Sequence, residues 1–478
     1  MTNLLNLIIF YRMKRIIGIF IVFFCAIATK AEMSVVPYVD ERTELVSIVF
    51  RLAGAKEYVT DNLKDYMNDI DTYFAAHKNH DVVKLTQDVW SQNGVAYDAV
   101  MSMATHIEIE NQEIKIKKDI IHGSIDQRWT EENIIKFVEL LNQFYKESKF
   151  HVFFGQHHDL YQKAVENFNK ILENVNFEWF EKFYGEQNKV NFLLIISLVN
   201  GGNNYGSKVL YTNQPEDLYA IIGTWATNES GEPIYSEQVI GTVIHEFNHS
   251  FCNDLIDEFY HQLEEQGKVF FGFVKEKMVR QAYGSSKTML YEILVRACVI
   301  KYYPSNVKLR ISRELSNGFF WIDELVNSLS AYEKNRDKYP TLKSYMPEIV
   351  KLQNSLSPEK IYEEIEKNKP IITETNIENE DQNVDPCIEK ITVKFSVPML
   401  TGNNGTRYGK FREFFPEFQD RKAEWNEETK MEWSFYVRLK PNTQYSICFP
   451  STFFLSAENY LNLKETYFLD FKTGDIRN

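Results

Sequence analysis

Cysteine is scarce in this chain, and an excess of basic charge is missing. Five cysteines occur in 478 residues and none of them form a CxxC pair, which argues against a disulfide scaffold and against a cysteine metal site. Lysine and arginine number 53 against 67 aspartates and glutamates, so the formal net charge is −14. This acidic balance argues against nonspecific binding to nucleic acid or to an anionic membrane.

The remaining composition is that of a folded protein. Hydrophobic residues make up 44% and charged residues 25%, which excludes wholesale disorder and collagen-like repeats. The length is too great for one ordinary compact domain and suggests two or three. Aromatic residues, at 14%, are frequent enough to build substantial cores.

One apolar run lies near the N-terminus, and no second run of comparable length follows. A basic stretch beginning at Met13 precedes the apolar residues 16–27, and small residues follow. This order is typical of a secretory signal peptide, and we expect cleavage after Ala31 or, alternatively, after Ala28. A membrane anchor is the disfavoured alternative, because the run is shorter than the ~20 residues that span a bilayer. We therefore expect residues 1–31 to direct export, giving a secreted, periplasmic or cell-surface protein.

The individual cysteines carry little further information. Cys25 lies in the expected signal peptide, and the bulky residues before it disfavour lipid modification. Cys387 and Cys448 share the C-terminal segment, where a disulfide and two free thiols remain equal alternatives. Cys252 and Cys298 are interpreted as small buried hydrophobic residues, with a bridge between their helices as the alternative.

Hydrophobic periodicity divides the larger part of the chain into helices and strands. Apolar residues recur every three or four positions over much of 32–182, which predicts helices. The continuous apolar run 191–199 ends at an Asn-Gly-Gly-Asn turn and predicts a buried strand, and 218–225 predicts a second strand. Two further helices are expected at about 236–265 and 286–303.

The pattern changes near residue 370. Residues 371–385 are polar, acidic and free of aromatic side chains, which predicts an exposed linker. Short β-rich runs follow, separated by turn signals such as Lys-Pro-Asn-Thr at 440–443, and predict a β-sandwich. The expected domains are therefore 32–370 and 386–478, joined by that linker.

The most informative motif is HEFNH at 245–249, which has the form HExxH and lies among apolar residues. On a helix, His245 and His249 lie one above the other, so both imidazoles can bind one Zn²⁺ ion. Glu246 lies about 100° around the helix from His245, near enough to act on a water molecule without ligating the metal. The alternative explanation is a helix with two ordinary hydrogen-bonded histidines.

A zinc site of this kind needs a third protein ligand, and Glu292 is the main candidate. It lies 43 positions after His249, in the otherwise apolar segment 289–297. An unpaired carboxylate is costly to bury, so it requires a metal or a cation. Arg296 at i+4 offers an ion pair, which is compatible with ligation because an arginine can orient a ligating carboxylate. His261 is the weaker candidate, because its neighbours resemble a solvated helix face.

This ligand set suggests hydrolysis. Two imidazoles and one carboxylate leave a position open for a metal-activated water, with Glu246 as its general base. An oxyanion would need a further hydrogen-bond donor, for which Tyr283 is the first candidate and Tyr291 and Tyr205 are weaker ones. The alternative for Tyr283 is an ordinary packed tyrosine.

The motif carries a family resemblance. HExxH with a glutamate on a following helix resembles the gluzincin arm of the zincin metallopeptidases. HEFNHSF followed by YEILVRA is similar to an uncharacterised family of secreted bacterial proteins with such a peptidase core, over about residues 34–364. The resemblance implies a zincin-like α+β fold, mostly helical, with a small twisted sheet whose edge strand binds an extended peptide. The wide gap before Glu292 departs from aminopeptidase-type gluzincins, so their exopeptidase specificity is not carried over.

The C-terminal segment has a resemblance of its own. Residues 391–399, 439–445 and 468–474 are similar to Ig-like domains appended to bacterial surface and secreted proteins. The resemblance implies an Ig-like β-sandwich that serves as a spacer or an adhesion module, and hence an association with the cell surface.

The sequence therefore predicts a secreted zinc metallopeptidase that acts on protein or peptide substrates and has no nucleic-acid partner. Zn²⁺ is expected on His245, His249 and Glu292, with Glu246 as the general base and Arg296 beside the carboxylate. The alternative is a non-catalytic cell-surface protein that binds peptide or glycan, although pure binding has no need of Glu246. A third interpretation is a structural protein with a fortuitous motif.

Overall fold

The computed structural model describes residues 35–475 apart from 122, 173–174, 186–189 and 403. The chain is of mixed α+β class, with many helices and several small sheets, which confirms the coarse fold class expected from the sequence. The expected signal peptide at 1–31 lies outside the described residues. In the described part of the chain, no helix has the length and apolar character needed to cross a membrane.

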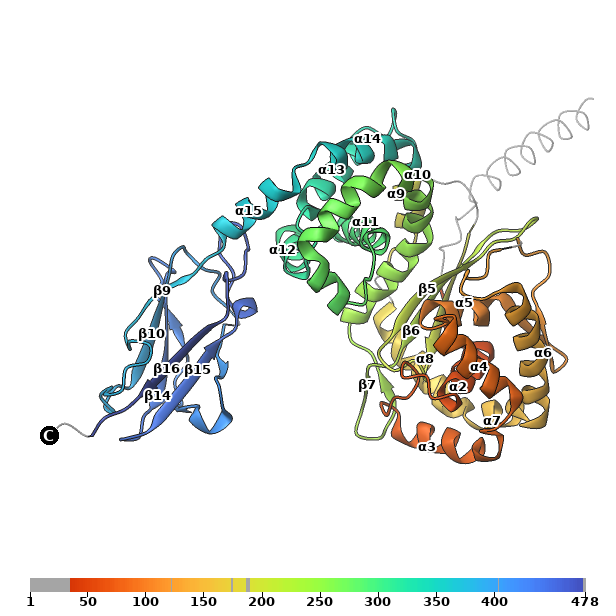
Figure 1. Ribbon diagram of the computed structural model, residues 1–478, viewed down its shortest axis with the longest axis horizontal. Coiled ribbons are helices and arrows are strands. Elements are labelled where there is room, and N and C mark those ends of the chain that lie inside the picture. Colours follow the sequence, from red (N-terminus) through yellow and green to blue (C-terminus); the bar gives the residue numbers. More distant parts are fainter. Residues whose placement is uncertain (1–34, 122, 173–174, 186–189, 403, 476–478) are drawn as a thin grey trace, which may run out of the picture.

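Helices fill most of the chain before residue 370, and strands dominate after it (Figure 1). The α-helices are α2 (Glu41–Leu52), α3 (Lys64–Tyr73), α4 (Asp81–Gln92), α5 (Asp98–His106), α6 (Glu131–Glu147), α7 (Phe150–Gln156), α8 (His158–Leu172), α9 (Glu178–Tyr184), α10 (Gln238–Arg280), α11 (Ser286–Tyr302), α12 (Val307–Asn317), α13 (Ile322–Lys334), α14 (Leu342–Ser355) and α15 (Pro358–Asn368). The strands before residue 370 are β1 (Pro37–Val39), β2 (Ile107–Glu110), β3 (Glu113–Ile116), β4 (Asn191–Ser197), β5 (Asn204–Val209), β6 (Asp217–Gly223), β7 (Ala226–Thr227) and β8 (Pro233–Ile234). The strands after it are β9 (Ile372–Thr375), β10 (Lys390–Phe395), β11 (Arg407–Tyr408), β12 (Glu417–Phe418), β13 (Glu424–Trp425), β14 (Glu432–Arg438), β15 (Gln444–Phe449) and β16 (Tyr467–Lys472).

A four-stranded sheet with the order β1-β4-β6-β5 lies between two helical layers. Strands β1, β4 and β6 run parallel, whereas the edge strand β5 is antiparallel to β6. Helices α9 and α10 cover one face, where the rings of Phe192 and Phe247 lie 5.0 Å apart. Helices α2 and α5 cover the other face, where Ser207 and Thr105 share a hydrogen bond. Burial on both faces explains the continuous apolar runs that predicted β4 and β6.

Helix α10 is 43 residues long and extends past the end expected at residue 265. Gly267 lies inside it, where a Cβ atom would approach Leu290 of α11 to 2.9 Å. The glycine therefore allows α11 to pack closely instead of ending the helix, and buried side chains such as Phe270 continue beyond it. Helix α11 begins after Ser285, whose side chain accepts a hydrogen bond from the backbone of Thr288.

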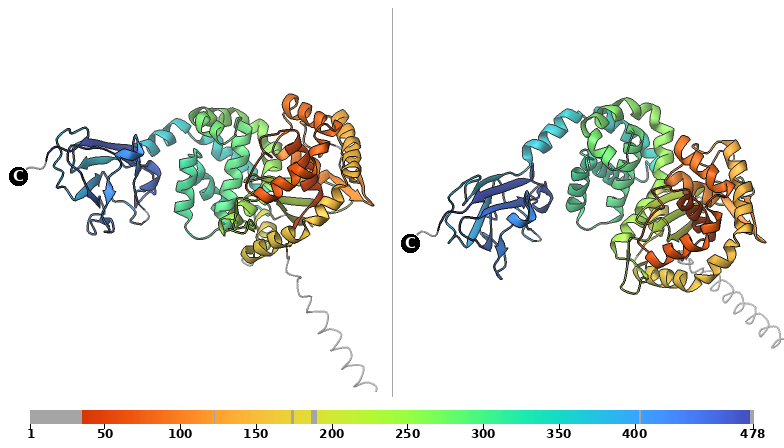
Figure 2. Two further views of the ribbon diagram at one scale, coloured as in Figure 1. Left: turned by 90° about the horizontal axis from the view of Figure 1, so that it is seen from below. Right: turned by 60° about the horizontal axis from the view of Figure 1, so that its bottom comes forward.

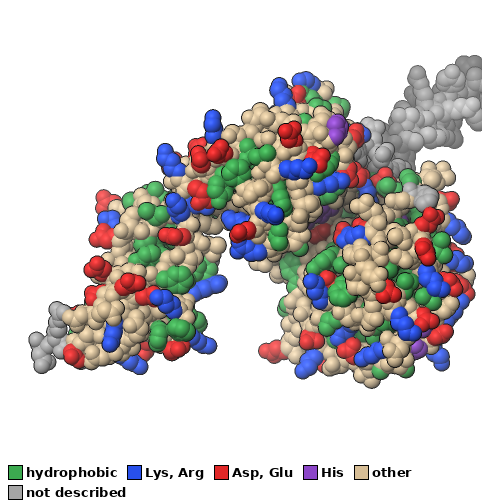
Figure 3. Space-filling model, in the orientation of Figure 1, with side chains coloured by type: hydrophobic (Ala, Val, Ile, Leu, Met, Phe, Trp, Pro, Cys, Tyr) green, Lys and Arg blue, Asp and Glu red, His purple; other side chains and the backbone are tan. Residues whose placement is uncertain are grey.

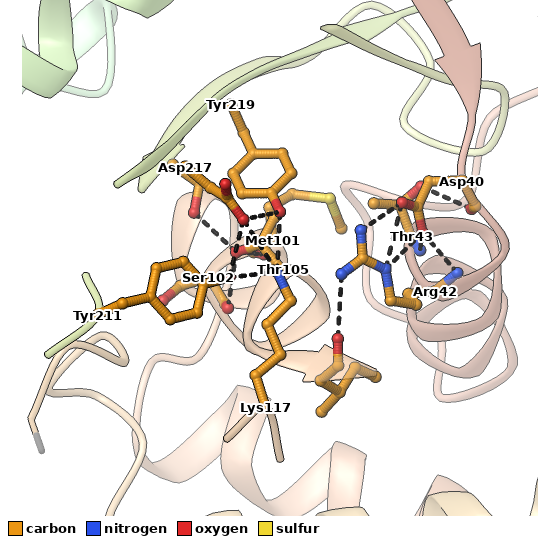
Figure 4. A network of polar contacts seen from close by, with 12 residues as sticks. Asp40, Arg42, Thr43, Met101, Ser102, Thr105, Lys117, Tyr211, Asp217 and Tyr219 are labelled. Carbon is orange, nitrogen blue, oxygen red and sulfur yellow. Dashed lines mark hydrogen bonds and ion pairs between the residues drawn. The ribbon is translucent and has the colours of Figure 1, made fainter. Parts of the chain in front are cut away.

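A polar network fastens the β2–β3 hairpin to the sheet (Figure 4). Lys117, just after β3, donates to the hydroxyl of Tyr219 at 2.9 Å and lies 3.4 Å from the carboxylate of Asp217 at the start of β6. Nearby, Arg42 pairs with Asp40 at 2.5 Å, and Asp40 also caps the N-terminus of α2. The network thus fixes the start of β6 and the first turn of α2.

Strands β9–β16 form a second unit around a core of their own. One sheet has the order β12-β14-β10-β9 with β13 also paired to β14, and the other has the order β11-β15-β16. The two sheets meet where the rings of Phe435 and Phe449 lie 6.1 Å apart. The prediction of an exposed linker at 371–385 is wrong, because β9 pairs with β10 and the side chains of Ile377 and Val384 are buried in this core. The segment has the composition of a linker because most of its other side chains are exposed, although Ile372 also packs against this core.

The second unit is joined to the rest by α15 (Figure 2), and two hydrogen bonds connect it to α12. The side chain of Asn462 donates to the hydroxyl of Ser316 at 2.5 Å, and Ser312 donates to the backbone carbonyl of Tyr460.

The four cysteines among the described residues are free thiols. Cys252 on α10 and Cys298 on α11 are buried, with their sulfur atoms 3.8 Å apart. Cys387 is exposed and Cys448 is buried. The pairings that the sequence left open are therefore not formed in this structure.

Candidate metal centre

His245 and His249 lie one turn apart on α10, and their Nε2 atoms face each other at 3.1 Å. Their rings are nearly perpendicular, with an interplanar angle of 81°. The orientation follows from the apolar side of the helix, because Phe247 is fully buried against the sheet. The histidines are thereby turned toward α11.

The carboxylate of Glu292 on α11 completes a cluster of three ligand groups. Its two oxygens lie 3.5 Å from Nε2 of His245 and 3.3 Å from Nε2 of His249, and the side chain is almost fully buried. All three ligand atoms lie within 4.8 Å of one another. A tetrahedral metal with bonds of about 2.0–2.1 Å places its ligand atoms about 3.3–3.4 Å apart. The spacing of the three groups therefore fits a single metal ion.

Asn253 fixes the proton of one imidazole. Its side-chain oxygen accepts a hydrogen bond from Nδ1 of His249 at 3.1 Å. A proton on Nδ1 leaves the lone pair of Nε2 facing the cluster, which is the arrangement a metal requires.

Arg296 connects the cluster to α12. It donates from Nε to Glu292 at 3.2 Å, from one terminal nitrogen to Glu314 at 2.7 Å and from the other to the hydroxyl of Tyr283 at 2.9 Å. Its guanidinium also lies 4.7 Å from the ring centre of Phe319. The i+4 ion pair expected from the sequence is present, and it leaves the carboxylate facing the histidines.

The charges of the cluster are arranged for a cation. Burial alone would raise the pKa of Glu292, but His245, His249 and Arg296 together hold it well below its usual range. Burial lowers the pKa of His245 to about 3. Burial also opposes a charge on His249, yet the hydrogen bond and negative charge of Glu292 outweigh it and raise its pKa to about 9. An ionised carboxylate that attracts a proton onto its neighbour would attract a metal ion for the same reason.

Glu246 lies beside the cluster on the face of α10 that meets β5. Its side chain is 7% exposed, and burial raises its pKa to about 7 against the opposing influence of His249 and the backbone of Gly206. Gly206 permits this contact, because a Cβ atom there would lie 2.5 Å from the backbone oxygen of Glu246. A buried carboxylate with a pKa near neutrality can exchange a proton during a reaction.

The weaker candidates from the sequence lie elsewhere. Tyr291 donates its hydroxyl to Asp257, and Tyr205 lies on the α5 face of the sheet, opposite to α10. His261 is exposed on α10, twelve residues or about 18 Å beyond His249. None of these side chains belongs to the three-residue cluster found in the described part of the chain.

Two residues of the site were missed from the sequence. Asn253 follows His249 at i+4, so it continues the ridge of the two histidines, and this spacing was a usable signal. Glu314 gave no signal in the sequence, because its position depends on how α12 packs on α11.

The surface is hollowed between this helical region and the N-terminal part of the chain (Figure 3).

Comparisons with known proteins give a family but no activity. The family described as "Domain of unknown function (DUF4932)" matches residues 25–352. The crystal structure of the S-layer protein rSbsC(31-844) is 11% identical and has a TM-score of 0.18, which does not establish a shared fold. The match covers 83% of this chain and 46% of that chain, so this chain spans about half of its length. None of the curated proteins matches this chain.

Proposed function

The chain belongs to the DUF4932 family of domains of unknown function, and from its own site geometry we propose that it is a zinc-dependent metallopeptidase. The observation that carries the proposal is the convergence of His245, His249 and Glu292 from two helices. The first two belong to an HExxH motif, and the glutamate of that motif lies buried beside them.

Zinc is the metal that fits these groups best. Two imidazoles and one carboxylate at tetrahedral spacing are the donor set of catalytic zinc sites, in which a fourth position stays open. Zinc bound there would activate a water molecule and polarise a substrate carbonyl. His249 is held in the required tautomer by Asn253, and Glu292 is oriented by Arg296.

The other residues have separate tasks in this proposal. Glu246 accepts the proton of the attacking water and passes it to the leaving amine, for which a pKa of about 7 is well suited. Tyr283 remains our candidate for hydrogen bonding to the oxyanion. Arg296 donates to its hydroxyl oxygen, and the hydroxyl also lies within hydrogen-bond reach of the Glu292 carboxylate, so Tyr283 borders the ligand cluster.

The finer assignments of fold and location are part of the same proposal. A long helix packed on a small sheet with the antiparallel edge strand β5 supports a zincin-like core. Two antiparallel sheets around one core support an Ig-like sandwich for the second unit. We also propose that residues 1–31 direct export.

The test is peptide cleavage by the zinc-loaded chain, followed by mass spectrometry of a peptide library. We expect the wild type to cut peptides, and Glu246→Gln to retain zinc while losing cleavage by about 10²- to 10⁴-fold. Glu258→Gln, at an exposed position of the same helix, is the matched control and should cut normally. If the zinc-loaded wild type leaves every peptide uncut, the proposal fails in favour of the binding-protein alternative.

A further inference from the structure

A cavity of about 640 Å³ opens beside His245 and is not used by the proposed mechanism. Its wall is formed by the start of α10, the end of α11 and α12. The charged side chains of the wall, besides the histidine, are Glu237, Arg296, Arg310, Arg313 and Glu314. The volume lies within the range of about 300–1,000 Å³ that is typical of small-molecule sites, so a substrate side chain or chain end fits easily.

Arg310 is held in place on this wall. Its guanidinium carbon lies 3.9 Å from the ring centre of Tyr303, so the planar group stacks on the ring. Its Nε atom is buried and has no hydrogen-bond partner among the described residues. A buried donor without a partner is costly, so hydrogen bonds within the described residues do not satisfy this guanidinium, and its terminal nitrogens are the donors left for a group that enters the cavity.

The charges around Arg310 are not balanced by acids. Burial lowers its pKa, Tyr303 opposes that effect and neighbouring Arg313 adds to it, while no carboxylate of the described residues contributes. Neither of these two arginines forms an ion pair within the part of the chain that the structure describes. An anion entering the cavity would therefore relieve repulsion between two cations.

The third arginine of the wall differs from these two. Arg296 is neutralised by Glu292 and Glu314. The remaining acid, Glu237, is exposed at the N-terminal end of α10. The wall thus carries three arginines against two glutamates, and the excess positive charge lies at Arg310 and Arg313.

Building on the proposed peptidase activity, we propose that this cavity binds a carboxylate of the substrate and that Arg310 selects it. The guanidinium fork matches a carboxylate with two parallel hydrogen bonds. Since the cavity borders His245, the carboxylate belongs to a residue close to the scissile bond. Its source is either the C-terminal carboxylate of a peptide or the side chain of an aspartate or glutamate, because both present the same group.

The first experiment compares kcat/KM of the zinc-loaded protein on four peptides that share one cleavable core taken from the library. One ends in a free carboxylate, and three are C-terminal amides with glutamine, glutamate or arginine near the cleaved bond. We expect one or both acidic peptides to exceed the glutamine amide by roughly 10- to 100-fold, with the arginine peptide poorest. The preferred acidic peptide identifies the source. Equal rates on all four would overturn the inference.

Variants of α12 assign the preference to Arg310. We expect Arg310→Gln to reduce the ratio of acidic to neutral cleavage by about 10-fold or more, and Arg310→Lys to reduce it less, because the charge remains while the fork is lost. Lys308→Gln, at an exposed position of the same helix, should keep the wild-type ratio. A wild-type ratio in Arg310→Gln would contradict the assignment.

Binding measurements separate this inference from the peptidase proposal. Calorimetry with zinc-loaded Glu246→Gln reports binding of the same four peptides without turnover. If the wild type cuts no library peptide, the four variants are built on one uncut library sequence; acidic peptides that then bind and need Arg310 support the cavity assignment, while the peptidase proposal fails. If peptides are cut, but neither cleavage nor binding favours the acidic peptides, the peptidase proposal stands and the cavity assignment fails.

Discussion

Glu44 on α2 is a fully buried carboxylate at the end of the central strand β4. It accepts hydrogen bonds from the backbone of Leu198 and from the hydroxyl of Tyr66, both at 2.8 Å. Burial nevertheless outweighs these bonds and raises its pKa from 4.5 to about 7. The end of the central strand β4 is therefore fastened by a group that is costly to ionise.

The raised pKa of Glu44 makes the free energy of unfolding depend on pH. Because its folded pKa is raised, the folded state holds the proton more tightly, so the contribution is complete below the unfolded value of 4.5 and is lost as pH rises through about 7. We expect this loss to reach roughly 3 kcal/mol between pH 4.5 and 8. Urea unfolding of the zinc-loaded wild type and of Glu44→Gln should show the wild type losing that much more stability over the range. Parallel pH profiles would contradict the prediction, and the exposed Glu131→Gln serves as the control.

Among the elements, those set by local sequence were predicted and those set by packing were not. The histidine helix and its follower carrying Glu292 were predictable because ligand spacing and apolar setting are local properties. The true end of α10 was not, because Gly267 is tolerated only through its contact with α11. Strand β9 reads as a linker, since an edge strand needs few apolar side chains. The sequence did not identify Arg310 as a residue near the site, because α12 reaches the cavity only through tertiary packing.

The contact between β5 and α10 gives a prediction at this scale. A Cβ atom at position 206 would lie 2.5 Å from the backbone oxygen of Glu246 and 3.2 Å from Cβ of His249, so Gly206→Ala must push the strand from the helix. We expect a destabilisation of about 1–3 kcal/mol and weaker zinc binding.

The matched control for this substitution is Gly272→Ala, at an exposed position of α10. A Cβ atom there has nothing within 4 Å, so this variant should be stabilised by up to about 1 kcal/mol. Chemical unfolding and zinc titration of both variants give the comparison. Wild-type stability and zinc affinity in Gly206→Ala would show that the close approach is unimportant.

At the scale of the whole molecule, the described residues form two separate hydrophobic cores, one before β9 and one from β9 onward. Helix α15 connects the two units that contain them (Figure 1). The candidate metal centre belongs to the first, and the strands β9–β16 enclose the second. The sequence pattern changes near residue 370, just before β9, whereas the predicted second domain began at 386. The pattern did not reveal the hydrogen bonds between α12 and the 460–462 segment, because they join polar residues distant in sequence.

Two cores predict two thermal transitions in the full zinc-loaded chain. A ligand that binds only the folded first unit stabilises that unit alone, by about 2.7 kcal/mol when its concentration is 100 times the Kd. Scanning calorimetry with and without a chelator should therefore move one transition to lower temperature and leave the other in place. A single transition that shifts as a whole would show that the units unfold together.

The binding of one metal ion by three side chains from α10 and α11 can be measured by zinc titration of the purified chain, followed by metal analysis. We expect one zinc per chain, with binding strongly reduced in His249→Ala and in Glu292→Gln, while the exposed control His261→Ala binds zinc like the wild type. A wild-type chain that takes up no zinc, or a Glu292→Gln variant with unchanged affinity, would contradict it.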